Sequence, residues 1–205
     1  MITRKLIVAA GVAVTCLLAT GVRGDENGDF DFHYSAQDLA TQTDYPFMYS
    51  GRVINEQHLQ WDNYRRTLQK FPDAQSCLTR GSRTGDQFDL TQFSWRGLRG
   101  SREIQVCLFR VATTLRDVDK MAAWLTTQEF EYVGINETAW SSIAGNSTER
   151  RVSGRWSIQK MREKRVGWPL LYSLYVILPP RFFSVSVTFG DTNEVFATSA
   201  SAQSK

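Results

Sequence analysis

The stretch FSVSVTF, residues 183–189, decides the fold. Its phenylalanines and valines alternate with serine and threonine, so an extended chain here has one apolar side and one side of hydroxyl groups. This period of two predicts a β-strand with one buried and one exposed face. The run LLYSLYVIL at 170–178, followed by the turn residues PPR at 179–181, predicts a preceding strand that forms a hairpin with it.

Working outward from this hairpin, further strands are predicted by apolar and polar patterning at 86–95, 103–111, 132–135 and 152–158. Residues 103–111 are apolar on both sides, which is typical of a strand near the middle of a sheet. The intervening residues 136–149 are polar and predict a loop.

Two segments carry helical signals. Residues 55–71 have an apolar stripe, with Asn55 as a possible cap and Pro72 as the terminator. Thr114 opens a second predicted helix that runs to Leu125. Because the connections between strands are mostly too short for parallel crossovers, we expect an α+β fold: a single domain with a mostly antiparallel sheet and two or more helices packed on one face.

The N-terminus is typical of an export signal. Arg4 and Lys5 precede an uncharged, mostly apolar run at 6–22, and Gly24 offers a small residue for cleavage. A short uncleaved anchor that contacts the membrane through 6–22, or a lipid on Cys16, are the alternatives. In all three cases the remainder of the chain is exported. The protein is then expected to be periplasmic or secreted, or to be anchored in the membrane and face outward.

The chain therefore divides into four predicted segments. Residues 1–24 are the signal peptide or anchor, and 25–54 are a flexible acidic mature N-terminus. Residues 55–192 form the α+β domain, which is long enough to bury a core. The Ser/Ala-rich residues 193–205 are predicted to be a disordered tail.

Cys77 and Cys107 are the only cysteines outside the signal. In an oxidising compartment such a pair is predicted to form a disulfide, and its loop of about 30 residues would contribute roughly 3–4 kcal/mol. Two buried thiols are the alternative. The only histidines, His33 and His58, lack ligand spacing to a cysteine, so we predict no metal and no cofactor.

Charge is unevenly distributed along the mature chain. Residues 25–76 hold nine acidic and four basic residues, whereas 77–205 hold 12 acidic and 17 basic residues. The basic residues cluster beside tryptophans, in 95–102 and in 150–168. Arginine and tryptophan are frequent interface anchors, and a cation beside an aromatic ring suits anionic partners. The residues predicted to bind a partner are Trp95, Arg96, Arg99, Arg151, Arg155, Trp156 and Arg162.

No catalytic motif stands out, and no catalytic residue is predicted. A hydrolytic triad would have to use His33 or His58, and neither a nucleophile elbow nor a phosphate-binding glycine loop is present in the sequence. We therefore expect an exported, non-catalytic binding or accessory protein of the envelope or extracellular space. Its partner would be a protein, or an anionic glycan or lipid, and not a nucleic acid.

Two alternatives stay open. A secreted, glycan-directed hydrolase that uses acidic residues requires two carboxylates that converge in a cleft, which a sequence does not reveal. A structural subunit of an envelope assembly requires an uncleaved N-terminal anchor.

Overall fold

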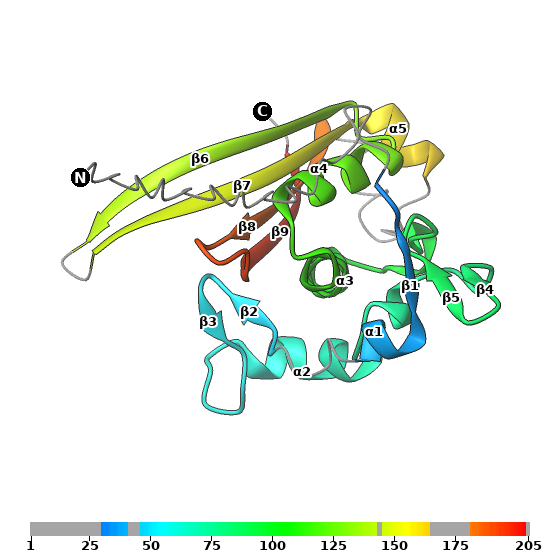
Figure 1. Ribbon diagram of the computed structural model, residues 1–205, viewed down its shortest axis with the longest axis horizontal. Coiled ribbons are helices and arrows are strands. Elements are labelled where there is room, and N and C mark those ends of the chain that lie inside the picture. The colour runs from blue at the N-terminus through cyan, green and yellow to red at the C-terminus, as the bar shows by residue number, and fades with distance from the viewer. Residues whose placement is uncertain (1–29, 41–45, 143–144, 165–180, 204–205) are drawn as a thin grey trace, which may run out of the picture.

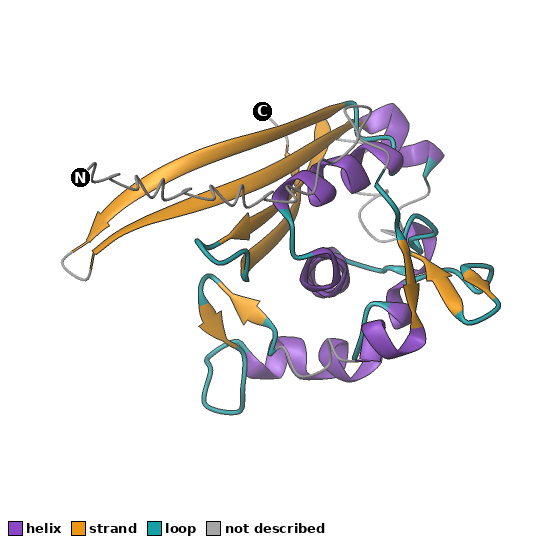
Figure 2. Ribbon diagram, in the orientation of Figure 1, coloured by secondary structure: helices purple, strands orange, loops and turns teal. Residues whose placement is uncertain are grey.

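The computed structural model describes residues 30–40, 46–142, 145–164 and 181–203. Its largest element is a four-stranded antiparallel sheet in the order β6-β7-β8-β9. The strands are β6 (Tyr132–Ser142), β7 (Gly145–Ser157), β8 (Phe182–Phe189) and β9 (Val195–Gln203). Helices α3 (Ser101–Leu115) and α4 (Val118–Thr127) lie on the same side of this sheet (Figure 1; Figure 2). The predicted single-domain α+β fold is confirmed.

Strand β8 has the two faces that its alternation predicts. Phe183, Val185 and Val187 are buried against the helices. The hydroxyls of Ser184 and Ser186 lie on the other face, 3.3 Å from Ser201 Oγ and 2.9 Å from Ser199 Oγ. The partner strand predicted at 170–178 lies outside the described residues, as does the export signal at 1–24.

The strand predicted at 103–111 is wrong, because these residues belong to helix α3. Every residue of α3 from Val106 to Leu115 is buried, since the sheet, α2 (Trp61–Lys70) and neighbouring segments surround it. A helix that is buried all round loses the one-sided stripe that distinguishes helices from strands in sequence.

Helix α4 begins three residues later than the Thr114 cap predicts. Thr114 still belongs to α3, and Arg116 adopts a left-handed conformation (φ 49°) that ends that helix. The side chain of Asp117 then caps α4, where its Oδ1 accepts a hydrogen bond of 2.8 Å from the backbone amide of Lys120. The helix predicted at 55–71 is shorter in the structure, because α2 starts at Trp61.

The segment predicted as a polar loop, 136–149, is mostly strand. Strands β6 and β7 pair from Tyr132↔Arg155 to Ser142↔Gly145, whereas β8 pairs with β7 only from Ser157 to Arg150. The distal part of the hairpin therefore projects beyond β8 as a two-stranded arm (Figure 1). The sequence did not predict a strand here, because 136–149 is polar and lacks an alternation of apolar and polar residues.

The predicted disordered tail at 193–205 and the predicted flexible N-terminus at 25–54 are also corrected. Residues 195–203 form β9, whose Thr198 hydroxyl donates to the Gln105 carbonyl of α3 at 2.9 Å. Within 25–54, the described residues include four buried apolar side chains: Phe32, Leu39, Phe47 and Ile54. The short elements there are β1 (His33–Ser35), α1 (Ala36–Ala40), β2 (Met48–Tyr49) and β3 (Arg52–Val53).

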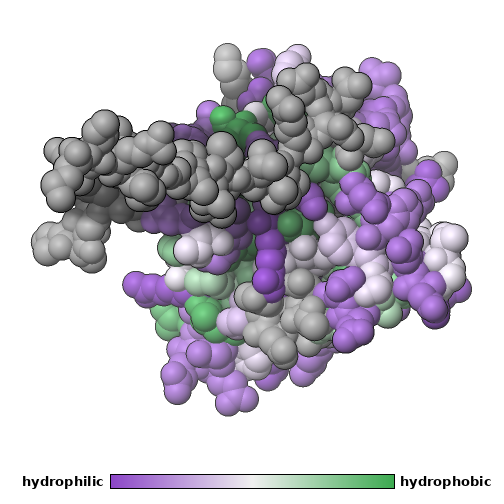
Figure 3. Space-filling model, viewed as in Figure 1, coloured by the Kyte–Doolittle hydropathy of each residue, from purple (hydrophilic) through white to green (hydrophobic). Residues whose placement is uncertain are grey.

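The remaining elements are short. They are η2 (Gln75–Cys77), β4 (Arg83–Thr84), β5 (Gln87–Asp89), η3 (Trp95–Gly97) and α5 (Ile158–Glu163). The strand predicted at 86–95 is thus confined to β5, which pairs with β1 and β4 in a small antiparallel sheet. Among the residues coloured in Figure 3, hydrophilic ones predominate, and an apolar patch lies near β2 and β3, where Val53 is exposed.

The predicted disulfide is present. Cys77 of η2 is bonded to Cys107 of α3, across a sequence separation of 30 residues. The bond fixes the segment before β4 to the central helix. None of the helices in the described part of the chain is long and apolar enough to cross a membrane.

Candidate ligand-binding surfaces

The face of the four-stranded sheet that points away from α3 and α4, here called the outer face, is lined by polar side chains. Its residues follow from the strand register and form two central rows. One row is Tyr132, Arg155, Ser184 and Ser201, and the next is Gly134, Ser153, Ser186 and Ser199. Backbone alternation places these side chains opposite the buried residues of the same strands.

Arg155 has an aromatic ring on either side. Its guanidinium carbon is 4.3 Å from the ring centroid of Phe182 and 5.9 Å from that of Tyr132. Tyr132 is 69% exposed, which is high for so large an apolar side chain. Stacking against aromatic faces restricts an arginine while its N–H groups stay available to a ligand. Arg155 is therefore a partly preorganised cation on an open surface.

Arg151 lies on the same face, four residues along β7. Its side chain is exposed, and its Nε donates to Thr188 Oγ1 at 3.4 Å. Four residues of extended chain span about 13 Å, which separates the two arginine positions. Between them, the outer face has a hollow of about 220 Å³ beside Tyr132, Gly134, Ser153, Arg155 and Ser184. Gly134 lines the hollow without a side chain to fill it. A Cβ at this edge position would meet no other atom within 4 Å.

A larger cleft of about 840 Å³ lies between η3, the C-terminal end of α4 and helix α5. Its lining includes Phe93, Trp95, Arg96, Gln128, Glu129, Lys160, Glu163 and Lys164. The cleft brings together parts of the two basic and aromatic segments, 95–102 and 150–168.

Glu129 is the centre of an ion cluster in the wall of this cleft. It accepts hydrogen bonds from the Nζ atoms of Lys160 and Lys164, the second at 2.5 Å, and Lys160 Nζ also lies 3.4 Å from Glu163 Oε2. The bonds from Lys160 and Lys164 lower the pKa of Glu129 to about 2. The bond to Glu129 raises the pKa of Lys160. The cluster joins α5 to the end of α4.

The floor of the cleft is held by Gln128, which is 4% exposed. Its Oε1 accepts from Trp95 Nε1 at 2.8 Å, and its Nε2 donates to the Thr91 carbonyl at 3.0 Å. A buried amide with both ends bonded has a fixed orientation. The floor of the cleft is therefore preorganised by hydrogen bonds within the protein.

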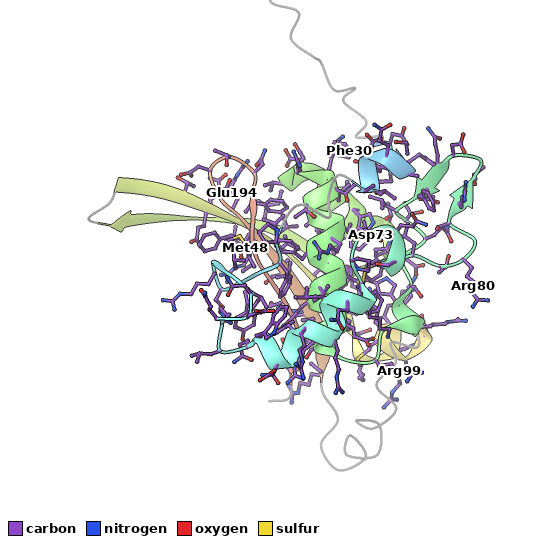
Figure 4. All side chains as sticks on the ribbon, turned by 90° about the horizontal axis from the view of Figure 1, so that it is seen from below. Phe30, Met48, Asp73, Arg80, Arg99 and Glu194 are labelled. Carbon is purple, nitrogen blue, oxygen red and sulfur yellow. A yellow bond between two sulfur atoms is a disulfide. The ribbon has the colours of Figure 1, made fainter. Side chains whose placement is uncertain are left out.

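The predicted Arg/Trp surface is divided in the structure. Trp95 and Trp156 are buried, with ring centroids 4.7 Å apart, so they form part of the core and not of a surface. Arg151 and Arg155 lie together on the outer face, and Arg96 lies at the cleft. Arg99 points away from the body of the molecule (Figure 4), and Arg162 is exposed on α5.

Sequence reasoning did not single out Tyr132, Phe182 or the serine rows. The alternation of β8 does carry the signal for the serines, because it places a hydroxyl at every second position. Tyr132 and Phe182 could not be assigned in advance, since their contacts with Arg155 depend on how β6, β7 and β8 are aligned.

The cleft also contains two carboxylates, Glu129 and Glu163, which both form ion pairs with Lys160. A glycoside hydrolase needs one carboxyl group that stays protonated to act as the acid. With its pKa lowered to about 2, Glu129 is ionised near neutral pH and does not supply that proton. Within the described ranges, no group of three or more potential metal ligands is found.

Comparisons of the chain with protein-family models, with curated proteins and with solved structures found no match.

Proposed function

We propose that this chain is an exported, non-catalytic binding protein whose outer sheet face holds an anionic glycan. The observation that carries the proposal is Arg155, an exposed cation between the rings of Tyr132 and Phe182, beside rows of serine hydroxyls. Export is supported by the charged and then apolar N-terminus and by the Cys77–Cys107 disulfide, which is typical of oxidising compartments.

The charge of the ligand follows from the two arginines. A guanidinium group offers several N–H donors in a plane and pairs with carboxylate or sulfate oxygens through two parallel hydrogen bonds. Arg151 and Arg155 are both exposed. The carboxylate of Glu131, beside Tyr132, accepts hydrogen bonds from the backbone amide and the hydroxyl of Ser157, and Glu149 lies beyond Arg151. A ligand with repeated negative charges would contact both positions.

The hydroxyl rows favour a glycan over a protein partner. Serine is depleted at protein interfaces, where bulkier side chains supply the buried area. On this face, serine occupies five of the eight positions in the two central rows. Serine hydroxyls donate and accept hydrogen bonds, as sugar hydroxyls do. The exposed ring of Tyr132 offers a flat apolar surface for the C–H groups of a sugar ring.

The test is binding of acidic polysaccharides, measured by calorimetry with heparin and polygalacturonate and with neutral dextran as the uncharged comparison. Wild type is expected to bind the acidic polymers and not dextran. The double variant Arg151→Glu/Arg155→Glu is expected to lose binding at least tenfold, because two contacts become repulsive.

The matched control is Arg66→Glu/Arg80→Glu, which makes the same change in net charge away from the sheet. Arg66 is exposed on α2, and Arg80 lies at the periphery of the molecule (Figure 4). This control is expected to bind like wild type. Equal losses in both double variants would mean that net charge alone attracts the polymer, which would overturn the assignment to the outer face.

A protein partner is the other outcome of this experiment. If the acidic polysaccharides do not bind, while a purified envelope protein binds wild type and not Arg151→Glu/Arg155→Glu, the outer face is an interface and the glycan proposal is wrong.

A further inference from the structure

The cleft between η3, α4 and α5 shares no lining residue with the hollow on the outer face, so it is a separate candidate binding site. We infer that it is a binding site for a single sugar acid, a polyhydroxylated carboxylate of the hexuronate kind. The inference stands on the cleft residues alone and does not depend on the glycan proposal for the sheet.

The volume of the cleft suits a small molecule. The cleft volume of about 840 Å³ lies within the range of roughly 300–1,000 Å³ that is usual for small-molecule sites. A monosaccharide fits in this space with part of its hydration shell. The hollow on the outer face, at about 220 Å³, is smaller.

The lining sets the polarity of the ligand. Thr79, Ser94 and Thr127 contribute hydroxyls and Gln92 contributes an amide, while the rings of Phe93 and Trp95, each 5% exposed, lie behind them as part of the core. Hydroxyls and amides match a ligand that carries several hydroxyl groups, because each partner both donates and accepts. A mostly apolar ligand would leave these groups without hydrogen bonds.

The floor is rigid, which favours binding of a small ligand. Gln128 holds Trp95 and the Thr91 carbonyl by hydrogen bonds, and Thr127 Oγ1 donates to the Trp124 carbonyl at 2.7 Å. The rings of Phe93 and Trp95 are in contact, with centroids 4.5 Å apart. Fixed groups need little ordering when a ligand binds, so more of the contact energy contributes to affinity.

The charges in the cleft favour an anion. Lys160, Lys164 and Arg96 outnumber Glu129 and Glu163. Lys160 and Lys164 are held by Glu129, so these three groups form a fixed wall. Arg96 is exposed and lines the cleft, and its guanidinium group can bind a carboxylate through two N–H groups. The ligand is thus expected to place its carboxylate at Arg96 and its hydroxyls toward the threonine and serine side chains.

The experiment is calorimetric titration of the purified protein with glucuronate and galacturonate. Glucose and galactose test the need for the carboxylate, and acetate tests the need for the hydroxyls. At least one hexuronate is expected to bind at least tenfold more tightly than its neutral sugar and than acetate. Arg96→Gln is expected to weaken hexuronate binding at least tenfold, while Arg99→Gln, three residues away and outside the cleft lining, retains it.

Three results would overturn the inference: no hexuronate binding, equal binding of the neutral sugar, or unchanged hexuronate binding in a folded Arg96→Gln variant. A thermal melt of each variant checks the folding. Failure here is distinguishable from failure of the outer-face proposal, because Arg151→Glu/Arg155→Glu should retain hexuronate binding and Arg96→Gln should retain polysaccharide binding.

Discussion

Arg155 and Trp156 are neighbours in sequence and lie on opposite sides of β7. Trp156 is buried, its ring stacks on Phe130 at 4.2 Å, and its Nε1 donates to the Glu129 carbonyl at 3.0 Å. Arg155 is exposed between Tyr132 and Phe182. A basic and aromatic cluster in a strand is therefore split between surface and core, because successive side chains alternate. This is why, within β7, Arg151 and Arg155 stay on the surface while Trp156 belongs to the core.

The contact of Arg155 with the rings predicts that lysine does not replace it. Arg155→Lys keeps the charge but loses the planar stacking, which contributes about 1 kcal/mol at exposed sites. We expect a drop of about fivefold in affinity for an acidic polysaccharide, measured by calorimetry. Among the described contacts, Arg151 has no such pair of rings, so Arg151→Lys should lower the affinity less. Equal losses of affinity would show that the rings do not contribute to binding.

Gly154 of β7 packs tightly against Phe130 and Leu125. A Cβ at this position would lie 2.9 Å from the ring of Phe130 and 3.3 Å from Leu125 Cδ1. We expect Gly154→Ala to lower the free energy of unfolding by about 1–3 kcal/mol in chemical denaturation, because α4 must shift away from the sheet. Gly134→Ala, whose Cβ meets open space, is the matched control and should change stability by less than about 0.5 kcal/mol. Equal changes in the free energy of unfolding for the two variants would contradict the tight packing of Phe130 against Gly154.

Among the elements, α3 is the one whose sequence is most misleading. Its run of β-branched and large apolar residues has the composition of a central strand, and its burial on all sides removes the helical stripe. The contacts of α3 with other elements determine that it is a helix. The sheet contacts one side of α3, and on another side Tyr64 of α2 donates a hydrogen bond of 2.5 Å to Gln105. Helix α2 and strand β8, which each have one exposed face, kept their periodic patterns and were predictable.

The disulfide joins η2 to α3 and is expected to stabilise the fold through its closed loop. The double variant Cys77→Ser/Cys107→Ser should lower the free energy of unfolding by roughly 3–4 kcal/mol, measured by denaturant titration. Wild type in a reducing agent should show a similar loss. Identical stability with and without the bond would contradict this role.

The ion cluster predicts a pH dependence for the attachment of α5. The pKa of Glu129 is lowered from 4.5 to about 2 in the folded chain, so its contribution to stability is complete above pH 4.5 and is lost as the pH falls toward 2. The contribution is small, because the side chain is half exposed. The difference in melting temperature between wild type and Glu129→Gln should thus favour wild type near neutral pH and vanish near pH 2. A difference that grows in acid would contradict it.

For the molecule as a whole, local patterns predicted the fold class and the disulfide, and long-range pairing determined the rest. Strand β9 has a Ser/Ala-rich sequence in which only Val195 and Phe196 are large and apolar, and it forms because β8 and α3 lie beside it. The cleft likewise depends on the approach of η3 to α5, which are about 60 residues apart in the chain. Neither arrangement is encoded in a short window of sequence.

The central claim, that the outer face binds an anionic glycan, is tested most directly by mapping the contact by NMR. Isotope-labelled protein would be titrated with a defined acidic oligosaccharide, and the amide and side-chain signals followed. We expect the shifted signals to cluster at Tyr132, Ser153, Arg155, Ser184 and Ser201. Shifts confined to other surfaces, or no shifts at saturating oligosaccharide, would contradict it.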